Sequence, residues 1–145
     1  MDLIASVRLA LAQTWAFYFL AHSFHWNVRG PLFAPFHKLF GDLYEDLHGA
    51  VDDLAERLRT LGVLAPSSLD EILAGATITF TAPPAAADMV VQLLAANAIA
   101  IAAIDAANEA AIASGNDGLA NFLQERLDAH AKWGWMLQAT LDPDA

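Results

Sequence analysis

The chain of 145 residues is 57% hydrophobic, contains no cysteine, and carries seventeen acidic against seven basic residues, a net charge of −10. Without cysteine it has no thiolate metal ligands and no cysteine nucleophile. The negative charge has the wrong sign for holding a phosphate backbone, which argues against DNA as a partner and favours cations.

The sequence also predicts no membrane span and no export signal. A span needs about 20 apolar residues, and the longest apolar runs are interrupted by Arg8 and Gln13 or by Asp105 and Glu109. The chain opens on "MD" without a basic stretch or a cleavage pattern, so we expect no signal peptide and a cytoplasmic protein. The high apolar fraction then predicts that part of the surface is covered by self-association.

Start and stop signals divide the sequence into four long segments of helical periodicity, predicted over residues 3–29, 34–61, 85–114 and 117–140. The dividing signals are Gly30-Pro31, Gly62, Pro83-Pro84 and Gly115. In the long connection after the second segment, "SSLDEIL" predicts a short extra helix capped by Ser67 or Ser68, and "TITFTAPP" predicts an extended stretch. We therefore predict one all-α domain over residues 1–145, a four-helix bundle with a short extra helix between its second and third long helices.

The first segment is apolar on two sides. One stripe at helical spacing contains Ile4, Val7, Leu11, Trp15 and Tyr18, and another contains Leu3, Ala10, Phe17 and Phe24. One side can face the bundle and the other a neighbouring subunit. His22 and His25 continue the first stripe, so we expect both imidazoles to be largely buried, either as hydrogen-bonded core residues or as part of a site.

The second segment carries a polar stripe opposite its apolar one. The apolar stripe consists of Phe36, Phe40, Leu43, Leu47, Leu54, Leu58 and Leu61, and the polar stripe of His37, Gly41, Glu45, His48, Asp52 and Glu56. A solvated face would intersperse Lys and Arg for i,i+4 pairing, but this stripe has neither between Gly41 and Glu56. Asp52 and Glu56, four residues apart, can direct both carboxylates at one hard cation.

His37 cannot join these two acids within one chain. Fifteen residues of helix separate it from Asp52 by roughly 22 Å, whereas the ligands of one metal lie within a few ångströms of each other. An antiparallel two-fold partner, related by an axis near residue 46, would place His37 of one chain beside Asp52 and Glu56 of the other. The spacing therefore predicts two equivalent intersubunit sites per dimer.

Several stretches together resemble one family. These are "HWNVRGP", a second histidine twelve residues after the one in that motif, "DLAERLRTLG", and "NDGLANFLQERLDAHAKWGWML" near the end. The set resembles the DNA-protection-during-starvation (Dps) proteins, which are mini-ferritins of the ferritin-like superfamily. The resemblance implies a ferritin-like four-helix bundle assembled into a dodecameric cage. It also implies that Fe2+ is bound between two-fold-related subunits, oxidised by hydrogen peroxide or O2, and stored as ferric mineral.

Carried over by position, the resemblance makes His25 and His37 iron ligands from one subunit, and Asp52 and Glu56 ligands from its partner. Zn2+ is a substitute metal for such a donor set. Trp26 matches an aromatic residue that usually lies beside the site, and we give it a catalytic role.

One position departs from the family pattern, which usually has an acidic residue four positions after the second histidine. This chain has Gly41 there, so we expect a weakened second iron position, and a non-enzymatic metal-binding cage remains the alternative function. A DNA-compacting role is disfavoured, because no basic tail precedes the first helix. Glu45 and His48 have the spacing of half a di-iron motif, but the later segments lack its companion.

Overall fold

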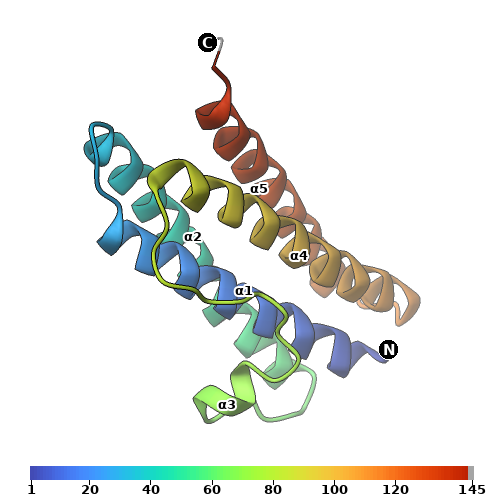
Figure 1. The fold of residues 1–145 in the computed structure, drawn as a ribbon. Helices are drawn as coiled ribbons and strands as arrows, with labels where there is room; N and C mark the ends of the chain where they lie inside the picture. Colours follow the sequence, from blue (N-terminus) through green and yellow to red (C-terminus); the bar gives the residue numbers. More distant parts are fainter. Residues whose placement is uncertain (144–145) are drawn as a thin grey trace.

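The structure, a computed structural model, describes residues 1–143 and is all-α (Figure 1). Its helices are α1 (Leu3–Asn27), α2 (Phe33–Thr60), α3 (Leu69–Ile72), α4 (Ala86–Ala113) and α5 (Asp117–Leu141). The four long helices and the short extra helix α3 confirm the predicted fold class, and each end of a long helix lies within two residues of its predicted position. The predicted domain also includes residues 144 and 145, which lie outside the described residues.

Side-chain caps explain where several helices begin. Asp2, Ser68 and Asn116 precede α1, α3 and α5, and each side-chain oxygen accepts a hydrogen bond from the backbone N–H three residues on. Of the two predicted caps, Ser67 and Ser68, the structure shows Ser68 as the cap of α3. α1 ends two residues earlier than predicted because Val28 leaves the helix for an extended conformation (φ −62°, ψ 144°) ahead of the turn into α2.

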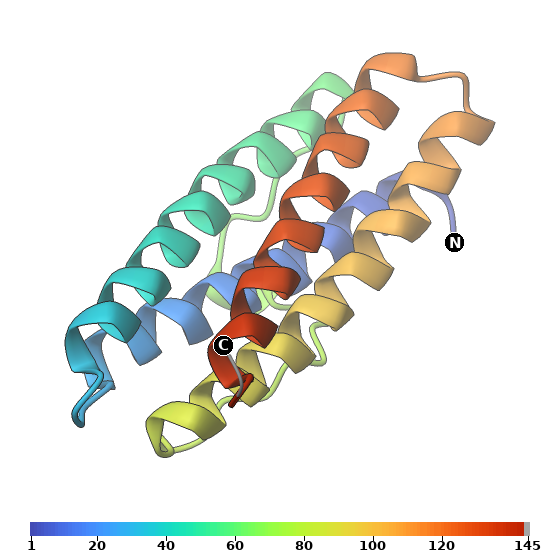
Figure 2. The same cartoon turned by 90° about the horizontal axis from the view of Figure 1, so that it is seen from above.

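The long helices form two hairpins, α1 with α2 and α4 with α5, and α1 also packs along α4. Figure 2 shows the four long helices running side by side, with the connection between α2 and α4 passing along the outside of the bundle. The predicted apolar stripe of α2 faces the interior, because Phe40, Leu43, Leu47, Leu54 and Leu58 are fully buried. In α1 the side chains of Ala10, Phe17 and Phe24 are buried as well.

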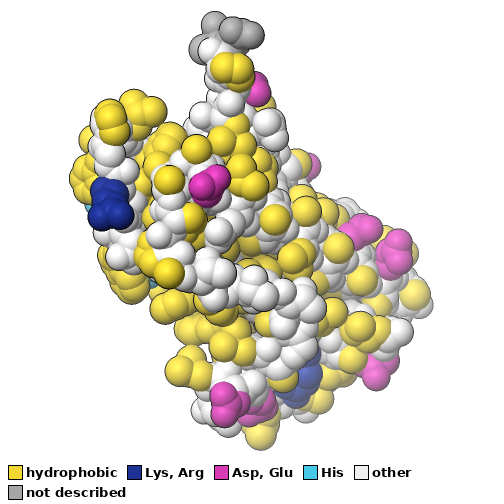
Figure 3. Space-filling view, viewed as in Figure 1, with side chains coloured by type: hydrophobic (Ala, Val, Ile, Leu, Met, Phe, Trp, Pro, Cys, Tyr) yellow, Lys and Arg dark blue, Asp and Glu magenta, His cyan; other side chains and the backbone are white. Residues whose placement is uncertain are grey.

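α1 and α4 are each long and apolar enough to cross a membrane by length and composition alone. Both are core helices of the bundle, and the packing of buried residues such as Phe17, Leu93 and Ile104 accounts for their composition. Hydrophobic side chains also cover much of the face that α1 and α4 present to the viewer in Figure 3. Val91 on α4 is 53% exposed, so part of the apolar surface lies outside the core of the chain.

Candidate metal centre

His25 and His37 lie together where the first hairpin turns. His25 is in the last turn of α1 and His37 is near the start of α2. Their rings are stacked, with centroids 3.7 Å apart and planes inclined by 18°. Nδ1 of His25 lies 2.6 Å from the backbone carbonyl oxygen of His37, and Nδ1 of His37 lies 2.7 Å from that of His25. The two imidazoles therefore form a reciprocal clamp between the helices.

The clamp fixes the tautomer of both neutral rings. A carbonyl oxygen can only accept a hydrogen bond, so each Nδ1 carries the proton and each Nε2 keeps its lone pair for a metal. Metal-binding histidines commonly donate their other ring N–H in this way. Because the lone pairs lie in the nearly parallel ring planes, they do not converge on one ion.

One half of the clamp also follows from helix geometry. The last four carbonyls of an α-helix have no partner within the helix, and His25 lies among the last residues of α1, which ends at Asn27. The ring Nδ1–H of His37, on α2, donates a hydrogen bond to the backbone carbonyl of His25. A short turn over residues 28–32 brings the two helix ends close enough for the bond.

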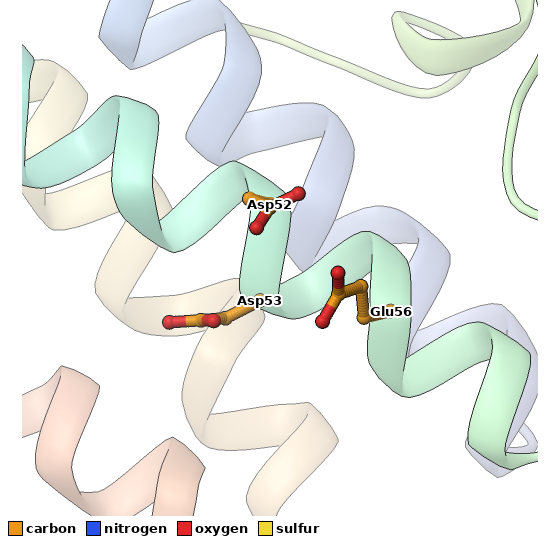
Figure 4. Close-up of side chains that lie close together, drawn as sticks. All are labelled: Asp52, Asp53 and Glu56. Atoms are coloured by element: carbon orange, nitrogen blue, oxygen red, sulfur yellow. The ribbon is translucent and has the colours of Figure 1, made fainter.

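Asp52, Asp53 and Glu56 form an acidic cluster on α2 (Figure 4). One carboxylate oxygen from each lies within 4.8 Å of the others, and all three residues are exposed. Carboxylate oxygens are the ligands that hard cations prefer. Asp52 and Glu56 belong to the predicted ligand set, whereas Asp53, the third member of the cluster, does not. Its spacing of three residues from Glu56 was the available signal.

The structure does not bring the histidine clamp and the acidic cluster together within one chain. α2 is continuous from Phe33 to Thr60, so the rise between His37 and Asp52 remains roughly 22 Å. The histidine clamp, between the end of α1 and the start of α2, and the acidic cluster, in the second half of α2, are thus separate within one chain. Their union across a two-fold axis stays a prediction.

Trp26 follows His25 directly in the chain, and its relative solvent exposure is 58%. Its ring centroid is 4.1 Å from that of His22. His22 in turn stacks on Tyr44 with centroids 3.7 Å apart and planes 6° apart, and its Nδ1 is 2.9 Å from the hydroxyl of Tyr18. Trp26 therefore belongs to an aromatic group beside the clamp, and its catalytic role stays a prediction.

His22 and His25 are half-buried, not largely buried as predicted. Their aromatic neighbours all belong to α1 and α2. Partial burial, followed by the charges of His25 and His48, lowers the pKa of His22. Glu45 and His48, the pair with the spacing of half a di-iron motif, are both exposed, away from the buried core of the bundle.

A polar cluster inside the bundle was not predicted. Asp46 of α2 accepts two hydrogen bonds of 2.9 Å from the guanidinium of Arg126 and one of 2.8 Å from the indole N–H of Trp133, both on α5. Nδ1 of His130 is 2.8 Å from the amide oxygen of Asn97 on α4. Nε2 of the same ring is 3.4 Å from Arg126. The cluster thus links α2, α4 and α5.

Burial shapes the titration of this cluster. Burial raises the pKa of the Asp46 carboxyl, but the hydrogen bonds and charge of Arg126 outweigh it, so the pKa is lowered overall. His130 is fully buried, and burial together with the charge of Arg126 lowers its pKa to about 4, although Asp46 opposes the shift. The available sequence signal was the apolar stripe of α5, where Arg126 and His130 occupy positions between Leu123 and Leu137.

Comparisons with known proteins agree with this architecture. The family model described as a ferritin-like domain matches residues 5–144. A DNA protection during starvation protein from Brevibacillus brevis is 32% identical over 126 residues, which cover 86% of this chain and 85% of that protein.

Solved structures show the same similarity in three dimensions. The crystal structure of a Dps protein from Bacillus brevis has a TM-score of 0.90 and 28% identity, covering 97% of this chain and 95% of that one. A Dps protein from Vibrio cholerae, described as a member of a broad superfamily of ferritin-like diiron-carboxylate proteins, has a TM-score of 0.91 and 28% identity, with 97% and 89% coverage. This chain therefore belongs to the Dps family of the ferritin-like superfamily.

Proposed function

We propose that this Dps-family chain binds Fe2+ at sites shared between two-fold-related subunits, oxidises it with hydrogen peroxide or O2, and stores the ferric product as mineral inside a dodecameric cage. In each site, His25 and His37 of one subunit and Asp52 and Glu56 of its partner would bind the iron. Such a protein would protect the cell from oxidative damage by removing Fe2+ and peroxide together.

The histidine clamp is the observation that carries this proposal. Its two Nε2 atoms are free, and both rings are held in place before any metal arrives. Imidazole and carboxylate together suit Fe2+, and Zn2+ as its substitute. The similarity to a protein described as a ferritin-like diiron-carboxylate protein supports iron as the substrate.

Two neighbouring irons suit the reaction with peroxide. Hydrogen peroxide accepts two electrons and each Fe2+ supplies one. The ion bound by His25 would also have Asp52 and Glu56. The ion bound by His37 would share Glu56 but lacks an acid at Gly41, so we expect one tight and one weak Fe2+ per site.

Anaerobic titration of the metal-free assembly with Fe2+, followed by peroxide, tests the proposal. We expect Fe2+ to bind and ferric absorbance to grow faster than in a protein-free control. His25→Ala and Glu56→Gln should both abolish this fast phase. Glu45→Gln, which removes an exposed carboxylate from the same helix, should leave it unchanged and serves as the matched control.

Gly41 supports one alternative, a cage that binds metal without oxidising it. Such a protein would bind Fe2+ or Zn2+ at His25 and Glu56 but would show no ferric absorbance above the protein-free control after peroxide is added. That result would reject the ferroxidase activity and retain the metal site.

A further inference from the structure

Residues 77–81, "TITFT", run along α1 within the connection between α2 and α4. Two hydrogen bonds of 2.9 and 3.1 Å join Thr77 to the side chain of Gln13. The Phe80 ring contacts that of Phe19, with centroids 5.7 Å apart. Between these two contacts α1 rises roughly 9 Å, which three residues of the connection span at about 3 Å each, close to the rise in a β-strand. Residues 77–81 are therefore extended, as their β-prone sequence predicts.

The backbone of this stretch is largely unpaired. The N–H of Thr77 bonds to Gln13, but the backbone groups of residues 78–81 have no hydrogen-bond partner among the described residues. Ile78 is buried, whereas residues 79–81 are exposed. An exposed extended backbone with free N–H and carbonyl groups is a template for pairing with another chain. Residues 77–81 thus have the properties of a β-strand at the edge of a sheet.

A strip of exposed aromatic rings connects this stretch with the histidine clamp. Phe80, Phe19 and Trp26 are 46%, 44% and 58% exposed. The Phe19 ring makes edge contacts with both of the others, at centroid distances of 5.7 and 6.5 Å, and Trp26 directly follows His25. A partner subunit that brings its acidic cluster to the clamp would therefore also lie against this strip.

The stretch lies at the height of the two-fold axis predicted from the metal site, which crosses the middle of α2. Tyr18 of α1 has the same height, because its ring packs against both Tyr44 and His48 of α2. Along α1, Tyr18 lies roughly 7.5 Å beyond the contact with Thr77. An extended chain covers this distance in about two residues, which places Thr79 at the axis.

We propose that residues 77–81 pair with the same residues of a second copy of this chain, as two antiparallel strands with Thr79 opposite Thr79 across the two-fold axis. The two backbones would satisfy each other's free N–H and carbonyl groups, and the two aromatic strips would pack together. The position of the axis rests on the proposed function, because it is taken from the intersubunit iron site. The extended backbone and its free groups do not depend on iron.

Disulfide cross-linking tests the pairing and its register, because the chain contains no cysteine. Opposite residues of antiparallel strands have Cα atoms about 4.5–5.5 Å apart, within the range of about 4.4–6.8 Å that disulfides require. Thr79→Cys should therefore give a disulfide-linked dimer when the assembly is mildly oxidised and run on a non-reducing denaturing gel.

Thr81→Cys is the matched control. It is exposed in the same stretch, but its two copies would lie about 13 Å apart along the strands, so it should remain monomeric on the gel. The double variant with Thr77→Cys and Thr81→Cys should form linked dimers again, because these two positions lie opposite each other in the proposed register.

Amide hydrogen exchange of the wild-type assembly separates paired strands from mere proximity. A backbone hydrogen bond contributes roughly 0.5–1.5 kcal/mol, so pairing should slow exchange in residues 78–81 by up to about tenfold. Leu64 and Ala65 of the same connection provide the internal reference, since their backbone N–H groups also have no partner among the described residues. Equal exchange rates in the two stretches would reject the hydrogen-bonded pairing.

The cross-linking outcomes separate this proposal from the proposed function. No linked dimer from Thr79→Cys, or equal linking of Thr79→Cys and Thr81→Cys, would overturn the pairing. Slow exchange without linking would show that another extended segment occupies the edge, and would also overturn it. If Thr79→Cys does not assemble, linking by the double variant decides. Register-specific linking and slow exchange in an assembly that binds no Fe2+ would reject the proposed function and leave the pairing intact.

Discussion

Acid should destabilise this protein through one buried histidine. The His130 ring is fully buried, its Nδ1 proton is donated to Asn97, and its Nε2 lone pair faces the guanidinium of Arg126. Protonation would place a second N–H and a second positive charge against that guanidinium. The folded state therefore resists protonation, and the pKa of His130 falls from 6.5 to about 4.

The sign and size of the effect follow from linkage. Between pH 6.5 and 4 the unfolded chain takes up a proton at this histidine and the folded chain does not, so the free energy of unfolding falls as the pH falls. The contribution is fully present above pH 6.5 and fully lost below about pH 4. At about 1.4 kcal/mol per pH unit, the loss amounts to about 3 kcal/mol, or about 10 °C in Tm for a chain of this length.

Thermal unfolding of the metal-free assembly, followed by circular dichroism between pH 7.5 and 4 at fixed protein concentration, measures this loss. His130→Gln is the reference variant, because a neutral amide can donate to Asn97 and accept from Arg126 without titrating. The other histidines and the carboxylates are common to both proteins, so their contributions cancel in the difference. Wild type should lose about 10 °C more than His130→Gln, and parallel pH profiles would refute the reasoning.

Two further predictions concern the partners of the chain. Assemblies that mix His37→Ala with Asp52→Ala subunits should retain Fe2+ sites that neither pure variant has. The reason is that an intersubunit site needs only the intact histidines of one chain and the intact acids of the other. Equal Fe2+ binding by mixed and pure variants would contradict the shared site. With seven basic residues and a net charge of −10, the protein should not shift duplex DNA in a gel at physiological salt, and a clear shift without divalent cations would show that the charge argument is wrong.

The fold could be predicted because its determinants are local. The apolar stripe that includes Phe40, Leu47 and Leu54 fixes the buried face of α2, and caps such as Ser68 fix where helices begin. These signals depend on residues a few positions apart, which a sequence displays directly. The composition also predicted apolar surface beyond the core, such as Val91 on α4.

The polar interior could not be predicted in the same way. Asp46, Arg126 and Asn97 are polar residues on three different helices, and their partners depend on how those helices are rotated and offset in the bundle. From the sequence, each of these residues would be interpreted as a surface residue or as a polar interruption of an apolar stripe. Only the packed structure shows that these residues hydrogen-bond within one cluster, which offsets the free-energy cost of burying their polar groups.

The candidate site lies between these two cases, because each group of proposed ligands lies close together within one chain, whereas joining the two groups would require a second subunit. The proposed ligand positions follow from helical spacing and from the resemblance, yet the contact of His25 with Gly41 depends on the turn between α1 and α2. α2 carries His37 of the histidine clamp near its start and the acidic cluster in its second half, with Asp46 between them. Apolar side chains of α2 and α5, such as Leu54 and Leu123, share one core cluster. The bonds from Arg126 and Trp133 to Asp46 add a polar link between the two helices at the middle of α2. The interior cluster thus helps to hold the helix that carries three of the four proposed ligands, His37, Asp52 and Glu56.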